Sequence, residues 1–123
     1  MYKNQKGRLI NVSNKIVHVA VGVIINAEQQ ILIALRPESS HQGGLWEFPG
    51  GKVEPDETVE TALSRELQEE LGLTVTHCRP LLEIQHDYTD KSVLLDVWWV
   101  DRFSGKAEGK EGQPIKWVQS QYL

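Results

Sequence analysis

The sequence has little cysteine and no long apolar run. Its 123 residues include one cysteine, Cys78, which can form neither an internal disulfide nor a thiolate pair for a structural metal. The longest apolar run, residues 19–25, contains a glycine and is far shorter than the roughly 20 residues of a membrane helix. No apolar stretch follows the basic residues near the N-terminus, which argues against a secretory signal. We therefore expect a cytoplasmic protein that does not bind membranes.

Repeats, low-complexity tracts and linkers are also missing. With 40% hydrophobic and 24% charged residues, the composition is typical of one soluble domain. The net charge of -4 argues against a protein that coats nucleic acid or binds duplexes directly. We expect a single, monomeric domain over residues 1–123, of which residues 1–15 form an N-terminal extension.

Strand patterns surround one helix. Short apolar or β-branched segments predict strands at residues 18–25, 31–35, 45–48, 81–86, 93–100 and 115–118. This order predicts an α/β (α+β) fold with a mixed β-sheet sandwiched between helices. Only five residues follow the last predicted strand, which would leave one sheet face with little cover. We therefore expect a C-terminal helix to be missing from this chain.

The helix has clear start and stop signals. Thr58 is a suitable N-cap, and Gly72 can end the helix in a left-handed conformation. Between them, Leu63, Leu67 and Leu71 recur every four residues and predict a buried stripe. The stripe should hold one face of the helix against the sheet.

A second face of this helix is acidic. On an α-helix, Glu66, Glu69 and Glu70 lie at relative angles of roughly 0°, -60° and +40°. Such a face can simply be solvated, but like charges at this spacing repel one another unless something neutralises them. A hard divalent cation such as Mg²⁺ would do so, whereas the lack of His or Cys at ligand spacing disfavours zinc. The preceding pair Gly50-Gly51 lets the backbone pass close to a ligand.

The glycine and the acidic face occur in one longer pattern. Residues 51–73 contain Gly51, Glu57, Arg65-Glu66-Leu67, Glu69-Glu70 and Gly72-Leu73 at the spacing of a complete Nudix box, and the chain therefore resembles the Nudix hydrolase family. Residues 45–52 and 109–114 extend the resemblance toward the MutT-type 8-oxo-dGTP diphosphatases.

This resemblance implies a Nudix fold whose box forms a loop–helix–loop. It also implies hydrolysis of a nucleoside triphosphate that depends on Mg²⁺, with Mn²⁺ as a substitute. Water would attack the β-phosphorus and give a monophosphate and pyrophosphate, which would remove 8-oxo-dGTP from the nucleotide pool. Alternatives are a Nudix hydrolase of a cytosine nucleotide, an ordinary dNTP or ADP-ribose, and a non-catalytic nucleotide-recognition module of a longer protein.

The resemblance also implies roles for individual residues. The metal would be bound by the Gly50 carbonyl, Glu66, Glu69, Glu70 and Glu111; the four glutamates are the candidate catalytic residues, with Glu66 the favoured general base. The residues expected to support the box are Gly51, Glu57, Arg65 and Gly72, with an ion pair between Glu57 and Arg65. The expected substrate contacts are Arg36, His41, Glu47, Phe48, Pro49, Gly50, Tyr88 and Lys91. The segment that reads the base in the MutT type would lie beyond Leu123.

Overall fold

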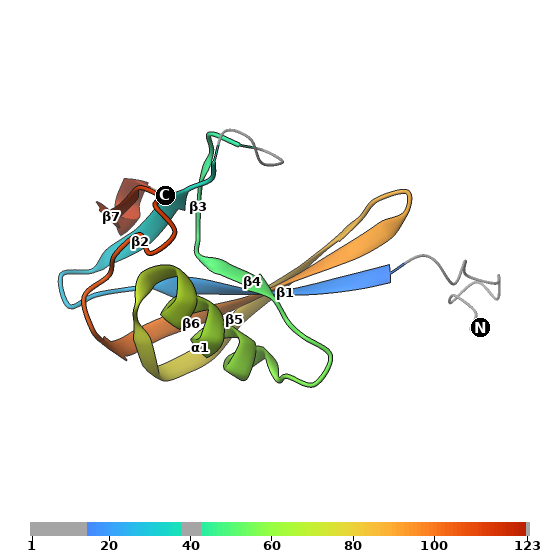
Figure 1. Ribbon diagram of the computed structural model, residues 1–123, viewed down its shortest axis with the longest axis horizontal. Helices are drawn as coiled ribbons and strands as arrows, with labels where there is room; N and C mark the ends of the chain where they lie inside the picture. The colour runs from blue at the N-terminus through green and yellow to red at the C-terminus, as the bar shows by residue number, and fades with distance from the viewer. Residues whose placement is uncertain (1–14, 38–42, 123) are drawn as a thin grey trace.

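Two β-sheets and one α-helix form the part of the chain that the computed structural model describes, residues 15–37 and 43–122 (Figure 1). The larger sheet has the order β4-β1-β6-β5, with strands at Gly50–Lys52, Lys15–Ile24, Lys91–Ser104 and Thr74–Asp87. The smaller sheet has the order β3-β2-β7, with strands at Trp46–Glu47, Gln30–Leu35 and Ile115–Gln119. Helix α1 spans Val59–Leu71, and a short 3₁₀ helix, η1, spans Ser120–Tyr122.

The larger sheet is mixed, as predicted. Strands β1 and β6 run parallel, whereas β1 with β4 and β5 with β6 are antiparallel. Where a single sheet was expected, the structure has two. Among the described residues, α1 is the one α-helix that covers them. None of the described helices has the length and apolar character needed to span a membrane.

Two strands differ from the sequence-based expectation. Strand β5 begins at Thr74 rather than at Leu81, because β6 is long enough to pair with the whole segment. Register shifts between Val75 and Leu82 interrupt the alternation of buried and exposed side chains that would have marked this strand. Strand β4 occupies residues expected to be a glycine turn, since its pairing with β1 depends on backbone groups and not on side chains.

Helix α1 begins and ends where the sequence predicts. Thr58 is the N-cap, and its hydroxyl oxygen accepts a hydrogen bond from the Thr61 N–H at 3.1 Å. Gly72 follows the helix with φ of 71°, and its N–H donates to the Gln68 carbonyl at 3.0 Å. The caps determine where α1 begins and ends, and the leucine stripe determines which face the helix turns toward the sheet.

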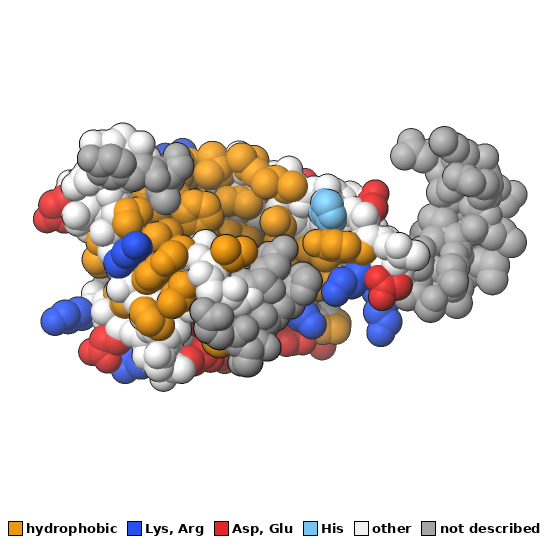
Figure 2. Space-filling view, turned by 90° about the horizontal axis from the view of Figure 1, so that it is seen from above, with side chains coloured by type: hydrophobic (Ala, Val, Ile, Leu, Met, Phe, Trp, Pro, Cys, Tyr) orange, Lys and Arg blue, Asp and Glu red, His pale blue; other side chains and the backbone are white. Residues whose placement is uncertain are grey.

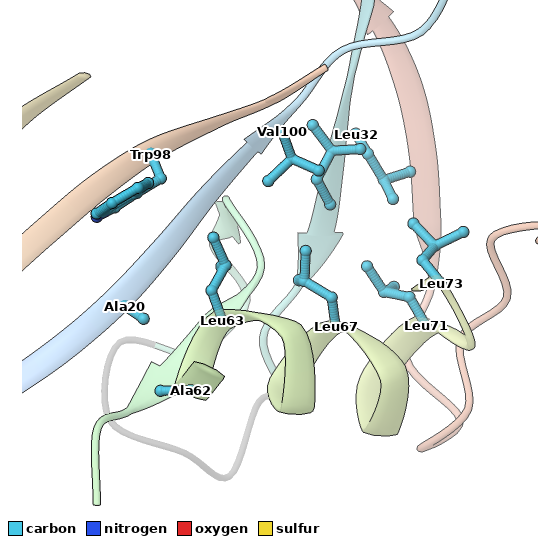
Figure 3. Close-up of a cluster of buried hydrophobic side chains, with 10 residues drawn as sticks. Ala20, Leu32, Ala62, Leu63, Leu67, Leu71, Leu73, Trp98 and Val100 are labelled. Atoms are coloured by element: carbon cyan, nitrogen blue, oxygen red, sulfur yellow. The ribbon is translucent and has the colours of Figure 1, made fainter. Parts of the chain in front are cut away.

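The main core lies between α1 and the sheets (Figure 3). Leu63, Leu67 and Leu71 are fully buried, as the four-residue spacing predicts. They pack with Ala20, Ile24, Leu32, Trp98 and Val100 from β1, β2 and β6. This packing immobilises the helix, so that its acidic face is held in a constant position relative to β4.

The opposite face of the larger sheet is less covered. A smaller cluster of Val23, Ile31 and Val97 lies there, with Phe48 and Leu95 packed against it. Figure 2 shows the molecule from above relative to Figure 1, on the side away from α1. Hydrophobic side chains gather over the middle of this side. Leu82 and Ile84 on β5 remain 47% and 49% exposed. A substantial apolar surface therefore remains accessible within the described part of the chain.

Candidate active site

An ion pair ties the loop before α1 to the helix. Arg65 donates through Nε and Nη2 to the two carboxylate oxygens of Glu57, at 2.7 and 2.8 Å. The same side chain donates to the Lys52 carbonyl, and Glu57 accepts from the Glu54 N–H. The guanidinium lowers the pKa of Glu57 to about 2, and the carboxylate in turn raises the pKa of Arg65. The predicted ion pair is present and closes residues 53–57 onto the helix.

Strand β4 brings its glycines next to the acidic face of α1. A Cβ atom at Gly51 would overlap the carboxyl group of Glu66, and one at Gly50 would overlap the carbonyl oxygen of Ala20. Glu66 also accepts a hydrogen bond from Arg65 Nη1 at 2.9 Å. The close approach to the Ala20 backbone requires a glycine at Gly50, and the missing side chain at Gly51 leaves room for the Glu66 carboxylate against the backbone of β4.

Glu70 has the most perturbed environment of the cluster. Burial, a hydrogen bond with Glu66 and the charges of Glu66, Glu111 and Glu47 raise its pKa from 4.5 to about 8. Its Oε2 atom is buried and has no hydrogen-bond partner among the described residues. A buried oxygen without a partner is costly, and carboxylates that repel one another are stabilised by a cation. The donor set therefore fits a hard divalent metal ion.

The carboxylates do not form a closed metal cage. Within the described ranges, no group of three or more histidine, cysteine, aspartate or glutamate side chains is arranged so that it alone could hold a metal ion. Glu69 is 57% exposed, with Oε2 at 3.6 Å from Arg65 Nη1. This openness agrees with the coordination of Mg²⁺, which usually takes one or two carboxylates and completes its shell with water and substrate phosphates.

Two adjoining pockets differ in chemistry. The first, of about 230 Å³, is lined by Glu70 and Glu111 together with Arg36, Glu47 and Gly50. The second, of about 380 Å³, shares Arg36, Glu47 and Gly50 with the first and is otherwise lined mainly by Val19, Val21, Phe48 and Leu95. An acidic compartment therefore opens beside an apolar one, with Arg36 and Glu47 at their shared boundary.

The predicted substrate contacts are only partly brought together. Arg36 Nη1 donates to both carboxylate oxygens of Glu47, at 2.9 and 3.1 Å, and Phe48 lines the apolar pocket. The Pro49 carbonyl accepts from the Gly22 N–H at 2.9 Å, so it also anchors β1.

Three further predicted contacts lie elsewhere or are not described. Tyr88 and Lys91 line a separate pocket of about 360 Å³ at the end of the β5–β6 hairpin. The Lys91 ammonium lies 6.0 Å from the centre of the Tyr88 ring. His41 lies outside the described residues.

The sequence analysis missed several residues that line these pockets. Val19, Val21 and Leu95 form walls of the apolar pocket, and Gln113 lines the acidic one. The parallel register of β1 and β6 places Val19 directly beside Leu95. The alternation of side chains along residues 19–23 could have assigned the valines to one face of the strand. The pairing register of β1 with β6, which completes the pocket, is a long-range property that a local pattern does not show.

A family comparison agrees with this arrangement. The model of the NUDIX domain matches residues 20–123, which include the loop, the helix and every lining residue of the two pockets except Val19. The chain belongs to the Nudix family. It is a Nudix hydrolase, an enzyme that acts on phosphoric anhydrides.

The Nudix relatives include two kinds of named enzyme. An 8-oxo-dGTP diphosphatase of Proteus vulgaris is 46% identical over 98 residues, covering 80% of this chain and 88% of the relative. A CTP pyrophosphohydrolase of Escherichia coli is 43% identical over 97 residues, covering 79% of this chain and 72% of the relative. A solved structure from a study of MutT from Aliivibrio salmonicida and Vibrio cholerae has 41% identity and a TM-score of 0.74, with 85% of this chain and 80% of that chain covered.

Proposed function

We propose that this Nudix hydrolase is a Mg²⁺-dependent nucleoside triphosphate pyrophosphohydrolase that removes 8-oxo-dGTP from the nucleotide pool. The observation that carries the proposal is the buried, unpartnered Oε2 of Glu70 among like-charged carboxylates, beside an apolar pocket. A divalent cation would neutralise the acidic compartment and bind the substrate phosphates there, and a nucleobase would occupy the apolar compartment. Mn²⁺ is the expected substitute for Mg²⁺.

The chain's own residues have distinct tasks in this reaction. Glu66, Glu69, Glu70, Glu111 and the Gly50 carbonyl would hold the metal. Bound there, the metal would neutralise phosphate charge and lower the pKa of water. Glu66 would accept a proton from the attacking water; its carboxylate lies against Gly51 and accepts a hydrogen bond from Arg65 Nη1. The new bond joins the water oxygen to the β-phosphorus, and the bond from that phosphorus to the α,β-bridging oxygen breaks.

The apolar pocket supports a flat, aromatic part of the substrate. Val19, Val21 and Leu95 offer apolar contact from the sheet, and Phe48 offers a ring from the segment before β4. Such contacts favour any nucleobase and discriminate weakly between bases. The proposed preference for 8-oxo-dGTP therefore rests on the diphosphatase relatives, and the CTP pyrophosphohydrolase relative makes a cytosine nucleotide the second candidate.

Steady-state kinetics on a nucleotide panel test the proposal. The purified protein would be assayed with Mg²⁺ against 8-oxo-dGTP, dGTP, CTP and ADP-ribose. We expect kcat/KM to be highest for 8-oxo-dGTP, with pyrophosphate as a product. A value no better than that for dGTP would contradict the sanitising role, and highest efficiency with CTP would favour the second candidate. Binding without hydrolysis of any compound would favour the recognition module.

The proposal also covers the cellular location and the oligomeric state of the protein. A cytoplasmic monomer agrees with the single cysteine and with relatives that act on free nucleotides. Size-exclusion chromatography with light scattering would measure the oligomeric state directly.

A further inference from the structure

The side chain of Gln113 joins two acidic residues of the site through their backbones. Its Nε2 donates a hydrogen bond to the Glu70 carbonyl at 3.0 Å, across 43 positions of sequence. Its Oε1 accepts a hydrogen bond from the Glu111 N–H at 2.9 Å. One primary amide therefore connects the last turn of α1, which carries Glu70, to the turn that carries Glu111.

This bridge is not the main cap of α1. The Glu70 carbonyl also accepts a hydrogen bond from the Lys110 N–H at 2.9 Å, and the Leu71 carbonyl accepts one from the Glu108 N–H at 3.0 Å. The helix C-terminus would keep both backbone donors if the Gln113 side chain were changed. Stabilising the end of the helix is therefore a poor explanation for the Gln113 bridge.

The bridge lies where the carboxylates of Glu70 and Glu111 influence each other electrostatically. Glu111 contributes to the raised pKa of Glu70, and both residues line the acidic pocket together with Gln113. Glu111 is exposed, so a short turn on the surface would otherwise let its side chain move away from the helix. Groups that orient metal ligands through hydrogen bonds typically change metal affinity or activity by about 10- to 100-fold when they are removed.

We propose that Gln113 is a positioning residue that holds the Glu111 turn against α1, so that Glu111 and Glu70 face the same metal ion. This inference rests on the proposed function, because it assigns both glutamates to the metal. The amide is suited to the task because it offers one donor for a carbonyl and one acceptor for an N–H. A glutamate at this position would keep the acceptor but could not donate to Glu70 when ionised.

The central test compares Gln113→Met with the wild type. Methionine has a similar length and neither hydrogen bond, and Gln119→Met on the exposed end of β7 is the matched control. We expect Gln113→Met to weaken Mn²⁺ binding to the substrate-free protein by about 10-fold or more and to lower kcat, with KM for the nucleotide changing less. Its Tm should stay within a few degrees of the wild type, and Gln119→Met should change none of these values.

A double-mutant cycle separates positioning from a general structural effect. If Gln113 acts through Glu111, Gln113→Met should add little further loss of Mn²⁺ affinity in a Glu111→Gln background. Gln113→Glu, which keeps only the acceptor, should reproduce most of the loss seen with Gln113→Met.

Three results would overturn the inference. The first is a Gln113→Met variant that keeps wild-type Mn²⁺ affinity and kcat. The second is a loss of Mn²⁺ affinity that adds fully in the double mutant. The third is a Gln113→Met variant that fails to fold although the Lys110 and Glu108 donors remain. In each case a wild type that binds Mn²⁺ and hydrolyses nucleotides would leave the proposed function standing. A wild type that does neither would refute the proposed function, and this inference with it.

Discussion

Neighbouring carboxylates on α1 have different environments. Glu66 lies against Gly51 and accepts a hydrogen bond from Arg65. Glu70, one turn further along, has a buried Oε2 atom and faces three other carboxylates, which favours its protonated form without a metal. Under the proposed function, Glu66 would act as the general base and Glu70 would bind the metal as a carboxylate.

Replacing the candidate base should separate catalysis from folding. We expect Glu66→Gln to lower kcat by about 10²- to 10⁴-fold, because the amide cannot accept the proton of the attacking water. Circular dichroism and Tm should remain close to the wild type, since the substitution preserves shape. Glu60→Gln, an exposed acid in the first turn of the same helix, is the control and should retain full activity. Equal activity of the two variants would remove Glu66 from the mechanism.

The raised pKa of Glu70 predicts a pH dependence of stability. Between its ordinary value of 4.5 and about 8, the folded metal-free protein holds a proton that the unfolded chain has released. Raising the pH through this interval should therefore lower the free energy of unfolding. Urea titrations with EDTA at pH 5, 6.5 and 8 would measure this trend, and Glu70→Gln should flatten it. A wild type and variant with the same pH profile would contradict this assignment.

At the scale of elements, the loop–helix–loop was the most predictable part of the molecule. The N-cap at Thr58, the end at Gly72 and the leucine stripe are local features, and each is confirmed. The placement of the acidic residues on one helix face follows from the same periodicity. By contrast, β4 and the early start of β5 depend on pairing with distant strands and were not predicted.

Arg65 should not tolerate the change to lysine. Its planar guanidinium binds both oxygens of Glu57 and the Lys52 carbonyl at once, which a single ammonium cannot reproduce. We expect Arg65→Lys to lower the free energy of unfolding by about 1–3 kcal/mol in urea titrations. Arg102→Lys, on the exposed end of β6, should change stability by less than about 0.5 kcal/mol. Equal stability of the two variants would show that the ion pair does not secure the loop.

At the scale of the whole molecule, the site depends on contacts between segments far apart in sequence. The resemblance to the Nudix family placed Glu111 near the glutamates proposed to bind the metal, whereas composition alone did not. The apolar pocket and the Gln113 bridge could not be predicted from spacing, because they require the β1–β6 register and a contact across 43 positions. The division into two sheets has the same origin, since it depends on which strands pair.

The two faces of the larger sheet should respond differently to truncation. Leu67 of α1 is fully buried against the sheets, so Leu67→Ala should lower the free energy of unfolding by about 2–5 kcal/mol. Leu82 is 47% exposed on the other face, and Leu82→Ala should cost less than about 1 kcal/mol. Guanidinium titrations would compare the two variants. A larger loss for Leu82→Ala would show that its face is more deeply buried in solution than the structure indicates.

Hydrolysis in ¹⁸O-labelled water tests the central claim most directly. The protein would be incubated with a nucleoside triphosphate in the presence of Mg²⁺ or EDTA, and the products analysed by mass spectrometry. We predict a monophosphate and pyrophosphate in the Mg²⁺ reaction, with the label in pyrophosphate because water attacks the β-phosphorus, and no turnover with EDTA. Label in the monophosphate would contradict the proposed attack, and equal turnover with EDTA would contradict the assignment of the acidic cluster to a metal.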